Sequence, residues 1–339
     1  LNTLLASTIT LTLAVVTKVG SGINYQLASD YKAVEVPAFI DTIINLFPSN
    51  LANSWVNGEV VPIVIFAVIV AIAYNKIARN QQKAVLPFKH FIDAGNRVMG
   101  EVVNFVISFT PYAVLALIAR AVSKSALSDL IPLLSVLGLA YLLSIIQIFG
   151  VTSVLLKVVG KLNPLNFFKG IWPAGVVAFT SQSSIGTIPV TVRQLTKKLG
   201  VNEDVASFVA SLGANLGMPG CAGIWPVLLA VFAINVLGID YSIGQYIFLI
   251  VLAVVVSIGT VGVPGTATIT ATALFASAGL PIEIIVLLAP ISSIVDMART
   301  ATNVVGAASA AMLVARSENE LDLAVYNNET IGQPDLEII

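Results

Sequence analysis

The chain has 339 residues, of which 57% are apolar and only 10% are charged. Soluble proteins carry roughly 25% charged residues, because their surface faces water. The composition therefore excludes a soluble enzyme, a nucleic-acid-binding protein and a disordered chain, and indicates an integral membrane protein. A net charge of −1 predicts no polyanionic partner, and a single cysteine and a single histidine exclude an intramolecular disulfide and a multi-histidine metal centre.

The first apolar run, residues 4–16, predicts the end of a membrane-spanning helix, because a complete span needs about 20 apolar residues. The chain begins with Leu1 inside this run. We expect one or two helices to precede it, and a cleaved or trimmed terminus explains the start equally well. The mixed composition of residues 21–58 predicts an external loop that contains a short amphipathic helix.

Two groups of basic residues indicate the orientation, because loops rich in Lys and Arg stay in the cytoplasm. The first group lies between predicted spans at 60–74 and 102–121 and comprises Lys76, Arg79, Lys83, Lys89 and Arg97. The second group follows a predicted span at 130–156 and comprises Lys157, Lys161 and Lys169. Residues 317–339 are polar and acidic, which predicts a solvated cytoplasmic tail. The protein is thus expected in the cell membrane, with its basic loops and its tail inside.

Between residues 167 and 316 the apolar stretches are interrupted by Gly, Pro, Ser and Thr. Two interruptions resemble each other: Ser-Ile-Gly-Thr-Ile-Pro over 184–189 and Ser-Ile-Gly-Thr-Val-Gly-Val-Pro-Gly over 257–265. Irregular backbone at membrane depth must be buried in protein or line a cavity, and interruptions in matching positions indicate a transporter's binding site. We interpret each as the tip of a helical hairpin that enters and leaves on the same side. Two proline-kinked spanning helices are the alternative.

A third interruption reads Gly-Ala-Asn-Leu-Gly-Met-Pro-Gly-Cys over residues 213–221. Three glycines and a proline in nine residues are incompatible with a regular helix. The pattern predicts an unwound segment within a spanning helix over about 204–237.

The last apolar segment, 284–314, contains charges that lipid would disfavour by about 2.5 kcal/mol or more each. Asp296, Arg299, Thr300 and Asn303 recur at helical spacing and therefore share one helix face. The guanidinium of Arg299 could bind a substrate carboxylate, and the carboxylate of Asp296 could bind a substrate ammonium group. This combination predicts a site for a zwitterion. The alternative is a structural Asp296–Arg299 pair that neutralises itself between helices.

Four motifs occur here in the order found in the dicarboxylate/amino acid:cation symporters, the glutamate-transporter-like family. They are the serine-rich tip at 181–184, Gly-Thr-x-Pro-Val-Thr at 186–191, Gly-Val-Pro-Gly at 262–265 and Asp-Met-x-Arg-Thr-x-x-Asn at 296–303. The sequence resembles this family over essentially its whole length. Known transporters with inverted repeats include a member of it.

The resemblance implies an all-α membrane protein with two re-entrant hairpins and an unwound penultimate helix, assembled as a homotrimer that works by an elevator motion. It implies a scaffold part at 1–163 and a transport part at 164–316. The transport part would comprise a hairpin at about 165–198, the broken helix at 204–237, a hairpin at 243–278 and a last helix at 283–316. The implied substrate-binding residues are Ser183, Ser184, Cys221, Gly262, Val263, Pro264, Gly265, Asp296, Arg299, Thr300 and Asn303.

Two family features are missing from this sequence. Acidic-amino-acid members have Asn-Met-Asp-Gly-Thr where this chain has Gly-Met-Pro-Gly-Cys at 217–221, and their sodium-binding carboxylate after Asn303 is replaced by Ala307. Backbone oxygens could still hold a cation, so Na⁺ and H⁺ both stay open as the coupling ion. The candidate cation ligands are the backbones of Gly213, Asn215, Ser257, Ile258, Thr260 and Asn303.

The run Gly-Cys-Ala-Gly-Ile-Trp-Pro at 220–226 resembles the branch of the family that takes up L-cystine. Small residues at 217, 219 and 221 would make room for this larger substrate. We therefore expect a cation-coupled L-cystine importer without an organic cofactor. The alternative is a sodium-coupled glutamate, aspartate or dicarboxylate symporter. A membrane enzyme is disfavoured, because Ser183 has no histidine or lysine at membrane depth to activate it.

Overall fold

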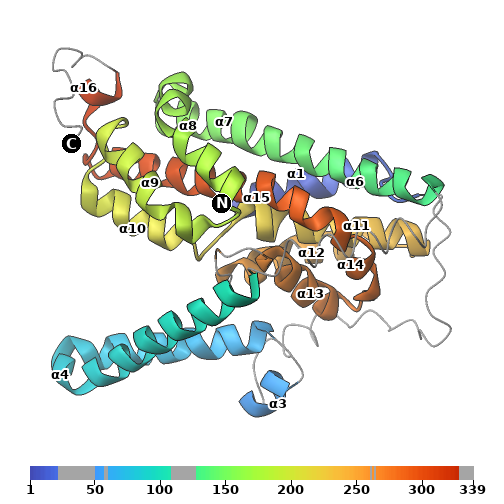
Figure 1. Ribbon diagram of the computed structural model, residues 1–339, viewed down its shortest axis with the longest axis horizontal. Coiled ribbons are helices and arrows are strands. Elements are labelled where there is room, and N and C mark those ends of the chain that lie inside the picture. The colour runs from blue at the N-terminus through green and yellow to red at the C-terminus, as the bar shows by residue number, and fades with distance from the viewer. Residues whose placement is uncertain (22–49, 57–59, 108–126, 260–261, 263–264, 328–339) are drawn as a thin grey trace.

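The computed structural model describes residues 1–21, 50–56, 60–107, 127–259, 262 and 265–327 (Figure 1). Within these residues the regular structure is entirely helical, apart from an isolated antiparallel bridge between Val201 and Leu321. Two helical stretches in this part of the chain, Leu133–Val159 and Pro219–Leu237, are long and apolar enough to cross a membrane.

The first elements are α1 (Asn2–Val16), α3 (Leu51–Val56) and α4 (Val60–Ile107). The sequence predicts a span at 60–74 followed by a basic loop, but the chain stays helical from 60 to 107, and only Gln81 has non-helical dihedral angles. Figure 1 shows α4 folded back at this point into two arms. The prediction of a basic loop is therefore wrong, and most of the span predicted at 102–121 lies outside the described residues.

A continuous helical stretch covers the span predicted at 130–156. It consists of α6 (Leu127–Ile145), the π-helix η1 (Ile146–Val151), α7 (Thr152–Val154) and the π-helix η2 (Leu155–Val159). Tyr141 on this stretch donates a hydrogen bond to the carbonyl of Ile294 at 2.8 Å, which places α6 beside the last long helix.

The first helix pair comprises α8 (Pro164–Ser181) and α9 (Ser184–Lys197), which pack against each other. Asn163 caps α8, and Ser183 caps α9 by accepting the N–H of Gly186 at 3.0 Å. Gln182 takes the left-handed conformation with φ 55°, which allows the sharp reversal between the two helices.

The second helix pair comprises α12 (Ile243–Val256) and α13 (Thr266–Ala278), joined through the short 3₁₀-helix η4 (Ser257–Gly259). Ser242 and Gln245 form a reciprocal capping box at the start of α12. Gly265 precedes α13 with φ 85°, a conformation that favours glycine.

Between the two pairs lie α10 (Glu203–Gly213), the π-helix η3 (Pro219–Ile224) and α11 (Trp225–Leu237). Residues 214–218 between α10 and η3 are not helical, as the glycines and the proline predict. Residues 225–234 of α11 are all buried, so this helix forms the centre of the larger apolar cluster.

The final elements are α14 (Glu283–Leu287), α15 (Ala289–Ser317) and α16 (Leu323–Tyr326). The predicted single helix at 283–316 is interrupted at Leu288, because a proline in the first turn of α15 cannot continue the preceding helix. The tail also differs from its prediction. Glu318, Glu320 and Asp322 are exposed, but Tyr326 is 2% exposed and packs in the core. Residues 328–339 lie outside the described residues.

Two apolar clusters divide α15 between them. Val295 belongs to the cluster around α11, whereas Val304 and the residues that follow belong to the cluster around α8 and α10. The polar stretch 296–303 lies between the two clusters, so the fold buries it while leaving it next to other polar elements.

Candidate functional site

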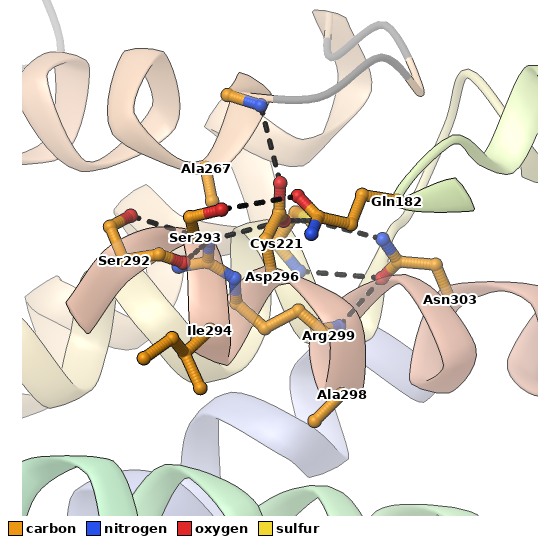
Figure 2. Close-up of polar contacts among 12 residues, drawn as sticks. Gln182, Cys221, Ala267, Ser292, Ser293, Ile294, Asp296, Ala298, Arg299 and Asn303 are labelled. Atoms are coloured by element: carbon orange, nitrogen blue, oxygen red, sulfur yellow. Dashed lines mark hydrogen bonds and ion pairs between the residues drawn. The ribbon is translucent and has the colours of Figure 1, made fainter. Parts of the chain in front are cut away.

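The candidate site lies where the middle of α15 meets η3 and the tips of both helix pairs. Figure 2 shows Gln182, Cys221, Asp296 and Asn303 directed toward one another from α8, η3 and α15. These segments are up to about 120 residues apart in sequence, and helical spacing predicts only the part of the site on α15.

Asp296 and Arg299 form a buried ion pair, with Nη2 3.1 Å from Oδ1. They are 4% and 1% exposed, so both charges are buried. Isolated charges at such depth are disfavoured by several kcal/mol, and pairing compensates for part of that penalty.

Arg299 has further partners at Nη2 and over the face of its guanidinium. Nη2 donates to the carbonyl of Ser292 at 2.9 Å, and the guanidinium carbon lies 4.5 Å from the ring centroid of Trp225. The buried Nε and Nη1 have no hydrogen-bond partner among the described residues. Two donors of a buried cation therefore remain available for an anionic group.

Asn303 connects α15 to the irregular start of η3. Its Oδ1 accepts the N–H groups of Gly220 at 2.8 Å and Cys221 at 3.3 Å, and its Nδ2 donates to the sulfur of Cys221 at 3.0 Å. These bonds satisfy N–H groups that the start of a helix leaves unpaired. Thr300, one turn earlier on the same helix face, is buried at 2% exposure.

The backbone of η3 lies directly against the backbone of α15, and this places Cys221 among the polar side chains of the site. Its thiol donates to Oδ1 of Asp296 at 3.9 Å, and its carbonyl accepts the hydroxyl of Thr270 at 2.7 Å. A Cβ on Gly220 would collide with the backbone carbonyl of Arg299, so only glycine fits there. Thr270 belongs to α13, so the second helix pair also reaches the site.

The tips of the two helix pairs meet beside this network. The N–H of Ile185 donates to the carbonyl of Gly262 at 3.1 Å, and the hydroxyl of Ser183 lies 3.5 Å from the same oxygen. The N–H of Gly265 donates to Oδ2 of Asp296 at 3.3 Å. Ser184 is buried beside Gly262. Val263 and Pro264, also predicted at the site, lie outside the described residues.

Sequence reasoning missed Trp225, Thr270 and Ser292 as partners of the predicted residues. Trp225 lies in the run at 220–226 that resembles the L-cystine branch of the family. An aromatic ring in a chain with a membrane-buried arginine could have indicated a cation–π contact. Nothing in the local sequence marks Thr270 or Ser292.

The predicted cation ligands only partly come together. The N–H of Gly217 donates to the carbonyl of Ser257 at 3.0 Å, which places the loop after Asn215 against η4. Gly213, Asn303 and Ala307 line a small cavity of about 10 Å³ with Ser184 and Thr191. Thr260 lies outside the described residues, and no group of three His, Cys, Asp or Glu side chains occurs within them. The oxygen atoms that could bind a cation in this cavity thus belong to hydroxyl, amide and backbone groups, and no carboxylate of a described residue lines it.

The arrangement can bind a molecule that carries both charges. Asp296 can accept an ammonium group, the free edge of Arg299 can bind a carboxylate in two hydrogen bonds, and the tip hydroxyls can orient it. The single histidine, His90, is exposed on α4.

Comparisons with known proteins identify the family of the chain. A family model described as the sodium:dicarboxylate symporter family matches residues 1–317. The chain is 32% identical over 303 residues to the L-cystine uptake protein TcyP of Bacillus thuringiensis (strain Al Hakam), covering 88% of this chain and 65% of that relative. It is 34% identical over 294 residues to an uncharacterized symporter of Haemophilus influenzae, covering 86% of this chain and 66% of the relative.

A further relative is the L-cystine uptake protein TcyP of Bacillus licheniformis, 31% identical over 309 residues, with 90% of this chain and 66% of the relative covered. The chain therefore spans about 65% of the length of the curated relatives that it matches. Because the family model matches nearly the whole chain, this protein belongs to the sodium:dicarboxylate symporter family.

Proposed function

We propose that the protein is a multi-pass membrane transporter that imports L-cystine together with a cation. The observation that carries the proposal is the buried Asp296–Arg299 pair, in which the arginine keeps Nε and Nη1 free. Family membership supports a cation-coupled transporter, and relatives named for L-cystine uptake support cystine as the substrate.

In the proposed binding mode, Asp296 holds a substrate ammonium group and Arg299 holds a distal polar group. Ser183, Ser184 and the tip at 262–265 bind the α-carboxylate, while Thr300, Asn303 and Cys221 complete the pocket. Cystine has two zwitterionic ends, and the small residues at 217 and 221 favour it by leaving space. One ammonium group of cystine would replace the N–H of Gly265 as the hydrogen-bond donor to Asp296.

The helix pairs are proposed to be re-entrant hairpins, and α10–η3–α11 an interrupted spanning helix. Their polar tips are paired with each other and with α15, which is what irregular backbone at membrane depth requires. We propose that residues 164–316 form a mobile transport part of a homotrimer that works by an elevator motion, with 1–163 mainly in the scaffold. The basic residues 76–97 and 157–169 would face the cytoplasm.

Either Na⁺ or H⁺ can be the coupling cation under this proposal. Pro219 and Ala307 remove the carboxylates that sodium uses in the family, so sodium would depend on the backbone oxygens near Gly213 and Ser257. Proton coupling would instead depend on a buried carboxylate, and Asp296 is one such group.

A sodium-coupled glutamate, aspartate or dicarboxylate symporter is the second candidate, and the family's description favours it. The missing carboxylates argue against it. A membrane enzyme is a weaker candidate still, because His90 is exposed on α4 whereas Ser183 and Asp296 are at the site.

The test is uptake of labelled cystine, glutamate and aspartate into proteoliposomes, with a sodium gradient and a pH gradient imposed separately. Cystine uptake that responds to one gradient and is abolished by Arg299→Ala supports the proposal. Lys157→Ala, at an exposed position away from the site, serves as a control. Aspartate uptake without cystine uptake would refute the substrate, and unchanged cystine uptake in Arg299→Ala would refute the site.

A further inference from the structure

Residues 318–327, here called the C-terminal segment, pair with the turn between α9 and α10. The N–H of Asn202 donates to the carbonyl of Glu320 at 3.0 Å, and the N–H of Asp322 donates to the carbonyl of Gly200 at 2.8 Å. These two bonds form the antiparallel bridge between Val201 and Leu321. The chain that follows α15 is therefore bonded to the end of the first helix pair where α8 begins and α9 ends, here called its base.

Tyr326 attaches the same segment to the other helix of that pair. Its ring is 2% exposed and packs in the cluster that contains Phe167 and Leu195, and its hydroxyl donates to the carbonyl of Asn163 at 2.7 Å. Asn163 is the residue that caps α8. One side chain thus contacts the start of α8, while the bridge holds the end of α9.

At Gly200 the structure leaves no room for a side chain. Gly200 has φ 71°, and a Cβ there would collide with the carbonyl of Asp322. Asp322 also caps the short helix α16, by accepting the N–H groups of Ala324 at 2.9 Å and Val325 at 3.2 Å. The short helix that carries Tyr326 is therefore built against the base in a defined position (Figure 1).

We propose that the C-terminal segment is a clasp that fastens the base of the first helix pair to the end of α15, so that α8, α9, α10 and α15 move as one body. This inference rests on the proposed transport function. Helices of 18 and 14 residues are roughly 27 and 21 Å long at 1.5 Å per residue. A small tilt at the base would therefore displace the tip residue Ser183 from Asp296, and the clasp prevents that tilt.

The first part of the test measures hydrogen exchange of backbone amides in the purified full chain. We expect Tyr326→Ala and Gly200→Ala to accelerate exchange at Asn202 and Asp322 about tenfold, because local opening becomes more frequent. Gly238→Ala is the matched control. Gly238 has a similar φ of 62° but nothing within 4 Å of its Cβ position, so it tests backbone strain without a collision. Amides of α11 should exchange as in the wild type, which excludes general unfolding.

The second part measures uptake by the same variants in proteoliposomes. We expect uptake about fivefold slower in Tyr326→Ala and Gly200→Ala, a smaller loss in Tyr326→Phe, which keeps the buried ring, and no loss in Gly238→Ala. Unchanged exchange in Tyr326→Ala, or faster exchange with wild-type uptake, would overturn the clasp. The exchange measurement needs no substrate. If the chain transports a substrate other than cystine, the uptake assay uses that substrate instead. Failure of the proposed function can therefore be distinguished from failure of the clasp.

Discussion

The two helix pairs share a layout but differ in what satisfies their polar ends. In the first pair, the side chains of Asn163 and Ser183 cap the N-termini of α8 and α9. In the second pair, a capping box begins α12, but α13 begins after Gly265 without a side-chain cap, and the N–H of Gly265 donates to Asp296. The second pair thus depends on the carboxylate that is proposed to bind substrate.

This difference indicates which pair responds to a ligand. A substrate ammonium group would compete with the Gly265 N–H for Asp296, whereas nothing at the base of the first pair involves the charged site. The first pair is held at its base by the C-terminal segment, and its tip is bonded to Gly262 in the tip of the second pair. We therefore expect substrate to shift the second pair more than the first pair.

The largest expected effect comes from Arg299→Ala. Removal of the guanidinium leaves the buried Asp296 carboxyl group without its ion-pair partner, and breaking a buried pair this way costs about 3–5 kcal/mol. We expect lower thermal stability and loss of substrate binding, measured by thermal unfolding and by equilibrium binding. The double variant Asp296→Asn/Arg299→Ala should recover stability but not binding. Retained binding in either variant would contradict the assigned role of the pair.

Gly262→Ala should break the contact between the two tips. The added Cβ would lie 2.8 Å from the Cβ of Ser184 and would collide with the carbonyl of Ala214, and overpacking of this kind costs about 1–3 kcal/mol. Substrate affinity should fall together with stability. Gly244→Ala is the control, because the nearest atom to its Cβ position is the Ser242 Oγ at 3.9 Å. An equal effect of both substitutions would contradict a specific tip contact.

Ser183→Ala and Ser242→Ala compare the two caps directly. Each removes a side chain that caps a helix, so each should lower the free energy of unfolding by about 1 kcal/mol. Only Ser183→Ala should also weaken substrate binding, because Ser183 lies at the tip beside Gly262. Equal binding by the two variants would show that the Ser183 hydroxyl serves the helix alone.

The smallest effect is a pH dependence at the base of the first pair. Burial raises the pKa of Tyr326 from its ordinary value of 10.0 to about 12, partly opposed by a hydrogen bond from the backbone of Phe167. A raised pKa means that the contribution of Tyr326 is complete below pH 10 and is lost as the pH rises toward 12. The exchange rate of the Asn202 amide relative to that of an unprotected amide at the same pH should rise over this interval, and Tyr326→Phe should remove the tyrosine's part of that rise.

Several elements were predictable because a local pattern determines them. Ser183, Gly265 and the glycines and proline at 217–220 mark interruptions, since these residues cap helices or adopt backbone angles that helices exclude. The polar face of α15 follows from helical spacing alone. The continuation of α4 past residue 74 and the interruption at Leu288 were not predicted, because helix continuity there depends on packing and on the position of one proline.

The sequence by itself determined that the chain is an integral membrane protein and that Asp296, Arg299 and Asn303 share a helix face, because composition and 3.6-residue periodicity are local properties. Only the tertiary structure decided what that face meets. Trp225, Thr270 and Cys221 reach it from other helices, and Tyr326 fastens the base of the first pair from the far end of the chain. Such contacts arise when separate apolar clusters pack around a polar stretch, and no spacing along the chain records which partners they bring together.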